Sequence, residues 1–123
     1  MSNFLSRRNA PAHLKKGKAA ENIASQYLQS HGLQLLTSNY RSRFGEIDLI
    51  MQDADVLVFI EVRYRKNMQY GGAASSITYQ KQQRIRKTAM TYLQKHGTHC
   101  PARFDVVAVE GNMQVINWIK NAF

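Results

Sequence analysis

The longest apolar run of the chain, residues 56–60, has only five residues, Val, Leu, Val, Phe and Ile, and Glu61 follows it directly. Branched and aromatic residues favour a strand, and an uninterrupted apolar run indicates that the strand is buried. Five residues are far fewer than the roughly 20 needed to cross a bilayer. The chain is therefore expected to fold around a buried strand, without a membrane-spanning segment.

Two segments before this run, residues 33–40 and 46–51, are also rich in branched or aromatic residues. Turns are expected at Gly45 and in the acidic segment 53–55. With residues 56–64, these segments predict three strands, and the last two form a hairpin. Later in the chain, residues 104–109 and 113–119 flank a Glu-Gly-Asn sequence that suits a second hairpin.

Two helices are predicted from apolar residues that recur at three- and four-residue steps. The first covers residues 13–30 and ends before Gly32, and the second covers residues 78–95 and ends before Gly97. Much of the basic charge lies on the opposite face of the second helix. A loop that contains Gly71 precedes this helix.

The length of 123 residues suits one domain with one core, and the predicted order of elements is αβββαββ. Residues 1–12 have no periodic apolar pattern and are interpreted as a basic, flexible leader to a domain of residues 13–123. The leader lacks a signal-peptide core, and the single cysteine, Cys100, agrees with a reducing compartment. A cytoplasmic location is expected.

The chain contains 17 Lys and Arg residues but only 8 Asp and Glu residues, which gives a formal net charge of +9. Such an excess favours a polyanionic partner. Nucleic acid is preferred to a membrane surface, and DNA to RNA, although a role in solubility alone is the alternative. The residues expected to contact nucleic acid are Arg41, Arg43, Arg65, Lys66, Lys81, Gln82 and Arg84.

Two acids, Asp48 and Glu61, lie inside predicted strands that otherwise look buried. An ionised carboxylate in an apolar setting costs several kcal/mol unless a cation or hydrogen bonds compensate it. Hard oxygen ligands favour Mg²⁺ or Mn²⁺, so both residues are candidate metal ligands. The alternative is a structural ion pair with Arg63 or Arg41. Asp105 is interpreted as a structural acid at a strand end.

The order of these motifs resembles the YraN-like family of small bacterial proteins, within the PD-(D/E)XK nuclease superfamily and related to archaeal Holliday junction resolvases. The resemblance extends from Gly17 to Val109. It rests on the motifs GKAAE at 17–21, NYR at 39–41, GEIDLI at 45–50, FIEVR at 59–63, KQ at 81–82 and RFDVV at 103–107.

This resemblance implies an α/β fold, with a single-domain, restriction-endonuclease-like αβββαβ core and a mixed central sheet flanked by helices. It implies that Asp48 and Glu61 bind Mg²⁺ or Mn²⁺ and that Glu21 reaches in from the first helix to support the metal or its water. The implied activity is hydrolysis of phosphodiester bonds in DNA, with branched or irregular DNA as candidate substrates.

Where the superfamily motif carries Lys, this chain has Arg63. Arginine stays protonated and cannot act as a general base, but its charge can stabilise a phosphate in the transition state. Lys66 and Lys81 are the candidates for supplying an ammonium group instead. The substitution leaves open whether the chain is an enzyme, and the alternative is a non-catalytic nucleic-acid-binding module with the nuclease fold. The oligomeric state, including a homodimer, is open as well.

Overall fold

The structure is a computed structural model that describes residues 12–66, 77–97 and 99–123. The predicted leader, except Ala12, and the predicted loop at Gly71 lie outside these residues. The elements are α2 (Ala12–Ser30), β1 (Gln34–Ser42), β2 (Gly45–Asp53), β3 (Val56–Arg65), α3 (Tyr79–His96), β4 (Ala102–Glu110) and β5 (Val115–Ile119). This order confirms the predicted αβββαβ core with one further strand.

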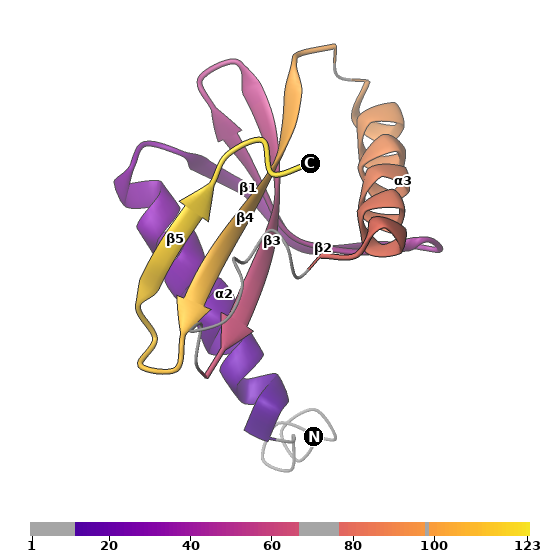
Figure 1. The fold of residues 1–123 in the computed structure, drawn as a ribbon. Helices are drawn as coiled ribbons and strands as arrows, with labels where there is room; N and C mark the ends of the chain where they lie inside the picture. The colour runs from indigo at the N-terminus through magenta and orange to yellow at the C-terminus, as the bar shows by residue number, and fades with distance from the viewer. Residues whose placement is uncertain (1–11, 67–76, 98) are drawn as a thin grey trace, which may run out of the picture.

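The five strands of the described residues belong to one sheet, in the order β1-β2-β3-β4-β5 (Figure 1). β1, β2 and β3 pair antiparallel, whereas β3 and β4 pair parallel and α3 connects them. β5 returns antiparallel to β4. The predicted mixed sheet and both predicted hairpins are therefore confirmed.

The two helices cover opposite faces of the sheet. Ala20, Ala24 and Leu28 of α2 belong to a buried cluster with Met51 and Ile60 of the sheet. A second cluster contains Ile85, Ala89 and Tyr92 of α3, together with Leu57 and Phe59. Neighbouring residues of a strand point to opposite faces, so Phe59 and Ile60 enter different clusters. β3 is consequently buried on both sides, as its apolar run indicates.

Both ends of α3 follow from local sequence. Thr78 caps the start, because its side-chain oxygen accepts a hydrogen bond from the Lys81 N–H at 3.1 Å. Gly97 ends the helix in a left-handed conformation, with φ of 60°, and its N–H donates to the Leu93 carbonyl. None of the described helices is long and apolar enough to span a membrane.

The tip of the β1–β2 hairpin is fixed against α3. The Tyr40 hydroxyl bonds Thr91 Oγ1 and the Ser42 hydroxyl bonds Thr88 Oγ1, each at 3.0 Å. Gly45 has φ of 151°, a conformation that side chains disfavour, and a Cβ atom there would lie 3.8 Å from both the Arg84 Cβ and Thr88 Oγ1. The backbone angle therefore favours glycine here, whereas the distance of 3.8 Å would leave room for a Cβ atom.

Candidate active site

The candidate site lies where β2 separates from β3. Backbone pairing between these strands runs from Asp53↔Val56 to Leu49↔Ile60. From Ile47 back to Gly45, β2 continues in pairing with β1. In Figure 1 the β1–β2 hairpin extends sideways past the beginning of α3. The separation opens the sheet locally, so side chains from both of its faces can reach one cleft.

Asp48 occupies the point of separation. Its Oδ2 accepts the Val62 N–H at 2.8 Å, so a side chain replaces a backbone partner where the strands diverge. Burial, followed by the negative charge and a hydrogen bond of Glu61, raises the Asp48 pKa to about 9. The two carboxyl groups are within hydrogen-bonding reach of each other, which favours a proton on Asp48. The site thus holds more carboxylate charge than its surroundings compensate.

Glu61 is buried on β3, with a side chain that is 6% exposed. It shares a strand face with Phe59, as its position in the strand predicts, and that face meets α3. Lys81 of α3 forms a salt bridge with it, between Nζ and Oε2 at 2.5 Å. The Lys81 side chain remains 38% exposed, so loss of Lys81 would leave a buried carboxylate unpaired, whereas loss of Glu61 would leave a cation that water can reach.

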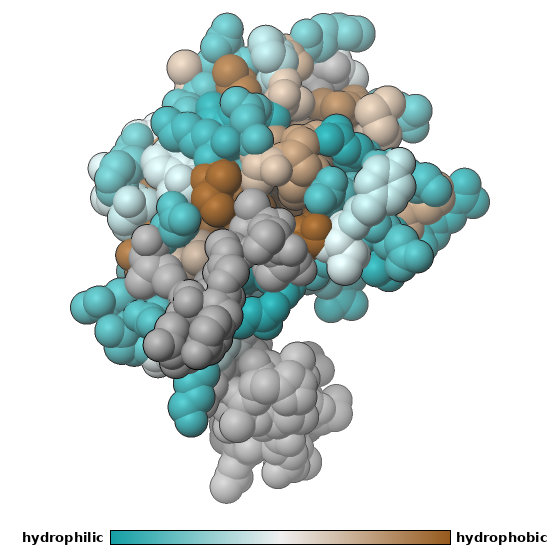
Figure 2. Space-filling view, in the orientation of Figure 1, coloured by the Kyte–Doolittle hydropathy of each residue, from teal (hydrophilic) through white to brown (hydrophobic). Residues whose placement is uncertain are grey.

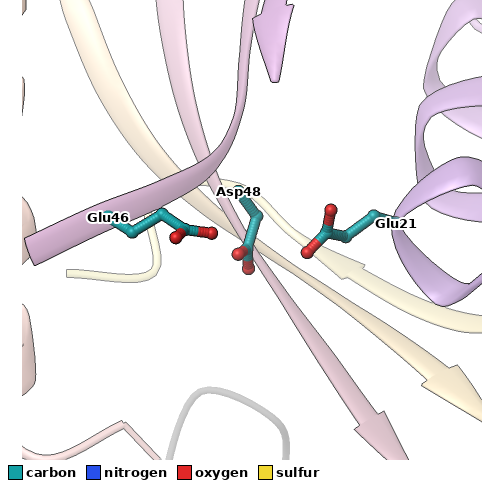
Figure 3. A group of neighbouring side chains, drawn as sticks. All are labelled: Glu21, Glu46 and Asp48. Atoms are coloured by element: carbon teal, nitrogen blue, oxygen red, sulfur yellow. The ribbon is translucent and has the colours of Figure 1, made fainter. Parts of the chain in front are cut away.

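Two further carboxylates converge on Asp48. One oxygen of Glu21, from α2, one of Glu46 and one of Asp48, both from β2, all lie within 4.8 Å of one another. Figure 3 shows the three side chains directed toward a common point. Glu21 and Glu46 come from different elements, so the cluster depends on the packing of α2 against the sheet.

Cations and an amide border this cluster from outside. Arg41 Nε lies 3.0 Å from Glu46 Oε2, and Lys18 Nζ lies 3.9 Å from Glu21 Oε1. Burial raises the pKa of Glu21, whereas Lys18 and a hydrogen bond from Asn39 partly offset this shift. Glu46 and Glu61 raise the Glu21 pKa further. The acids therefore repel one another despite these neighbours.

The acids line a cleft of about 440 Å³. It opens between the N-terminal halves of α2 and α3. The charged residues of its wall are Glu21, Glu46, Asp48, Glu61, Arg63, Lys81 and Arg84. Four carboxylates and three cations thus face the same space, which is the composition expected for a site that binds a cation and a phosphate together.

The donor set fits a small divalent cation. Carboxylate oxygens are the ligands that Mg²⁺ and Mn²⁺ prefer, and opposite ligands of one Mg²⁺ ion lie about 4.2 Å apart, given bonds of about 2.1 Å. Only one pair among three ligands can be opposite, and neighbouring ligands lie about 3.0 Å apart. The three carboxylate oxygens, which lie within 4.8 Å of one another, would therefore have to move closer together around an ion. A bound cation would also offset the burial and the repulsion that raise the Asp48 pKa.

The four residues expected to be catalytic, Glu21, Asp48, Glu61 and Arg63, all line this cleft. The structure differs from the expectation in how the acids group: Asp48 clusters with Glu21 and Glu46, while Glu61 contacts Asp48 and Lys81. Glu46 was not among the predicted ligands. Its position two residues before Asp48, on the same strand face, is the signal that could have identified it.

The residues expected to bind nucleic acid separate into two groups. Lys81 and Arg84 line the cleft, and Arg41 contacts its acid Glu46. Arg43 lies at the hairpin tip, Arg65 and Lys66 are exposed at the end of β3, and the Gln82 amide donates to the Ile77 carbonyl at 3.1 Å. Hydrophilic residues form most of the molecular outline in Figure 2, and hydrophobic residues appear as small patches between them.

Asp105 has a different environment, on β4 beside the edge strand β5. It is fully buried inside β4 rather than at its end, and both of its oxygens accept hydrogen bonds from Arg103 Nε, at 3.1 and 3.2 Å. The Trp118 indole N–H and the Asn121 backbone N–H complete its contacts, at 2.9 and 3.1 Å. Arg103 also pairs with Asp53. These contacts agree with the interpretation of Asp105 as a structural acid, but the expected position at a strand end was wrong.

Comparison with known proteins identifies the family. The model of the family described as "Uncharacterised protein family UPF0102" matches residues 20–109. A UPF0102 protein of Legionella pneumophila (strain Corby) is 50% identical over 111 residues, covering 89% of this chain and 94% of its own length. One from Nitrosomonas europaea is 52% identical over 109 residues, covering 88% and 92%. The chain therefore belongs to the UPF0102 family, the YraN-like family that its motifs resemble.

Proposed function

We propose that this protein is a metal-dependent endonuclease of the PD-(D/E)XK type that hydrolyses phosphodiester bonds in DNA. The convergence of Glu21, Glu46 and Asp48 on one point, within a cleft that also contains Lys81, is the observation that carries the proposal. Carboxylates suited to a divalent cation and side chains suited to a phosphate are the two requirements of such a reaction. We further propose a cytoplasmic location.

Asp48, Glu46 and Glu21 would hold Mg²⁺ or Mn²⁺, with Glu61 at the edge of this set. A bound ion supplies polarisation of the phosphate and a lower pKa for a water ligand. Asp48 would hold the cation as an ionised carboxylate. The Val62 N–H, at 2.8 Å from Asp48, fixes the orientation of that carboxylate. Glu21 lies on α2, opposite the β2 acids Glu46 and Asp48, so it can orient a water from that side of the cleft.

The superfamily motif has a lysine at the position of Arg63. Lys81 is the candidate for supplying that ammonium group instead. It reaches Glu61 from α3, and it lines the cleft beside Arg84. Lys66, the other candidate, lines a different hollow, with Tyr64 and Glu110. In this proposal Lys81 stabilises the negative charge that develops on the phosphate, and Arg63 adds a second cation to the same wall.

The charge of the chain supports a nucleic acid substrate. The helix α3 contains Lys81, Arg84, Arg86, Lys87 and Lys95 and no acidic residue. Contacts between such cations and phosphates supply most of the affinity for nucleic acid that is independent of sequence. The acidic cleft thus lies beside a basic helix that can hold the strand to be cut.

Cleavage assays test the proposal directly. Purified protein is incubated with junction, flap, duplex and single-stranded DNA in Mn²⁺, Mg²⁺ or EDTA. We expect metal-dependent cleavage of at least one substrate, and we expect Asp48→Asn to lower its rate at least about 100-fold, because a metal contributes several kcal/mol to the transition state. Lys81→Met should lower it by a similar factor, and Lys81→Arg by less.

Asp55→Asn is the matched control, because Asp55 is an exposed acid in the turn before β3. It should leave cleavage unchanged. Cleavage that persists in EDTA or in Asp48→Asn would refute the proposal. A protein that binds DNA in EDTA but cuts none of the substrates with either metal would have the second candidate function, a nucleic-acid-binding module that retains the fold without the chemistry. Arg63 is the residue that favours this candidate, because arginine cannot act as a general base.

A further inference from the structure

A second hollow lies beside the acidic cleft, between the tip of the β1–β2 hairpin and α3. It has a volume of about 650 Å³, within the range of roughly 300–1,000 Å³ typical of small-ligand sites. We propose that this hairpin hollow binds one unpaired nucleotide of the strand whose phosphate lies in the acidic cleft. This proposal rests on the proposed function and specifies its substrate as DNA with an unpaired segment. The hollow is lined by Ser42, Arg43, Phe44, Lys87, Met90, Thr91 and Gln94.

The walls of the hairpin hollow are held in place by the same contacts that fix the hairpin to α3. The Tyr40 hydroxyl bonds Thr91 Oγ1 at 3.0 Å, and Thr91 Oγ1 in turn donates to the Thr88 carbonyl at 2.7 Å. Ser42 Oγ bonds Thr88 Oγ1 and also accepts the Phe44 N–H, each at 3.0 Å. A ligand therefore enters a hollow that is already formed, which lowers the entropic cost of binding.

Apolar and cationic groups of the hollow match the two parts of a nucleotide. Phe44 is half-buried and Met90 is 53% exposed, so each presents apolar surface to a base. Arg43 Cζ lies 4.8 Å and Lys87 Nζ lies 5.6 Å from the centre of the Phe44 ring. Both cations lie over the ring, so a base that packs on Phe44 takes the place of a cation there, and that cation stays close enough to contact the phosphate of the same nucleotide.

Charge favours a nucleic acid as the occupant. The lining of the hairpin hollow includes two cations, Arg43 and Lys87, and no acid. The helix that forms one wall, α3, has five Lys and Arg residues and no Asp or Glu. The same lining includes Phe44 and Met90, so a ligand that combines a flat apolar group with negative charge would suit the hollow. An unpaired nucleotide has both properties.

The hairpin hollow and the acidic cleft share the hairpin tip and α3 as walls. Phe44 lines the hollow and its neighbour Gly45 lines the cleft. On α3, Lys87 lines the hollow, and Arg84, about one helical turn earlier, lines the cleft. A strand that passes along α3 can thus present a phosphate to the acids and an adjacent base to Phe44. A fully paired duplex keeps its bases stacked inside and cannot use the hollow.

Binding measurements in EDTA test the base-binding hollow separately from cleavage. Fluorescence anisotropy compares an oligothymidine of about 12 nucleotides with an abasic strand of the same length. We expect the protein to bind oligothymidine at least about fivefold more tightly, because stacking on aromatic side chains adds affinity only when bases are present. Phe44→Ala should remove this preference without weakening binding to the abasic strand.

Matched variants separate stacking from charge and from folding. Lys87→Gln should weaken binding to both strands and reduce the slope of log K against log salt by about 0.7, the contribution of one phosphate contact to a single strand. Tyr79→Ala, which removes a 73% exposed aromatic residue outside the hollow, should leave the preference intact. Phe44→Leu, a milder change at the hairpin, should reduce the preference if the Ala variant does not fold.

Equal affinity of the unmodified protein for the two strands would overturn the base-binding proposal. So would a Phe44→Ala variant that loses binding to phosphatidylserine vesicles or to polyglutamate while keeping its preference for oligothymidine, because the hollow would then bind a membrane or an acidic protein. Failure to cleave DNA in Mn²⁺ refutes the proposed hydrolysis and leaves the affinity ratio in EDTA unaffected. The two failures are therefore distinguishable.

Discussion

Asp48 and Asp105 are two aspartates enclosed by the same sheet, yet their surroundings differ in kind. Asp105 receives hydrogen bonds from a guanidinium group, an indole and a backbone N–H. Asp48 receives one backbone N–H and meets a second carboxyl group, that of Glu61. The first acid is compensated within the fold, whereas the second becomes compensated only when it binds a proton or a cation. The comparison teaches that partners, rather than burial, separate a structural acid from a candidate ligand.

The largest effect is expected from removing the compensated acid. Asp105→Ala removes one of the two acids that pair with Arg103, whose side chain is only 13% exposed, and leaves the Trp118 and Asn121 N–H groups without their acceptor. We expect the free energy of unfolding to fall by about 3–5 kcal/mol. Urea unfolding in EDTA measures it, with Asp48→Asn as the comparison. If both variants lose the same stability, the contrast between the two aspartates is wrong.

Metal addition should stabilise the protein through Asp48. At a Mn²⁺ concentration of about 100 times its dissociation constant, the folded state gains about 2.7 kcal/mol. Thermal unfolding should therefore shift upward with Mn²⁺ for the unmodified chain and for Asp55→Asn. Asp48→Asn should show little shift, since it removes one ligand and the negative charge. An equal shift in all three proteins would locate the cation elsewhere.

In EDTA, the raised pKa of Asp48 should make the free energy of unfolding fall as the pH rises. The sign is opposite to that of a carboxyl group whose pKa is lowered by folding. Because the Asp48 pKa is about 9 in the folded protein and 3.8 ordinarily, the folded state binds the proton more strongly. Its contribution to stability is complete below about pH 4 and is lost as the pH rises toward 9.

Asp48→Asn lacks this titration, so its stability relative to the unmodified protein should increase by about 2 kcal/mol between pH 5 and pH 6.5, close to the maximum of about 1.4 kcal/mol per pH unit. Chemical denaturation at several pH values provides the measurement. A difference that is constant with pH would mean that Asp48 is ionised in the absence of metal.

The smallest effect on stability is expected at the edge of the cleft. The Arg41 side chain is 80% exposed, although its Nε lies 3.0 Å from Glu46. Arg41→Gln should therefore change the free energy of unfolding by less than about 0.5 kcal/mol. Its affinity for DNA should decrease and become less dependent on salt, because one phosphate contact is lost. A larger destabilisation, in the same urea titrations, would show that Glu46 depends on Arg41 for its position.

Sequence patterns were sufficient for the elements because their signals are local. The apolar stripes and the positions of Thr78 and Gly97 predict α3 to within a residue or two, and the run after Val56 predicts the buried strand. Alternation along β3 correctly assigned Glu61 to the face opposite Ile60. These properties depend on residues that are close together in the chain.

The site required information that the sequence pattern does not contain. Lys81 meets Glu61 only because α3 packs across the face of β3, and 20 positions of chain separate the two residues. The separation of β2 from β3 at Leu49, which opens the cleft, leaves no mark in the apolar periodicity. One alternative interpretation paired Arg41 with Asp48 or Glu61. That partner was wrong, because Arg41 contacts Glu46.

Anomalous diffraction from crystals grown with Mn²⁺ tests the central claim most directly. We predict one strong peak among the carboxylates of Glu21, Glu46 and Asp48, with Asp48 still accepting the Val62 N–H, and no peak at Asp105. The account is contradicted if these carboxylates contact only protein groups in the presence of Mn²⁺, or if the metal lies away from the cleft.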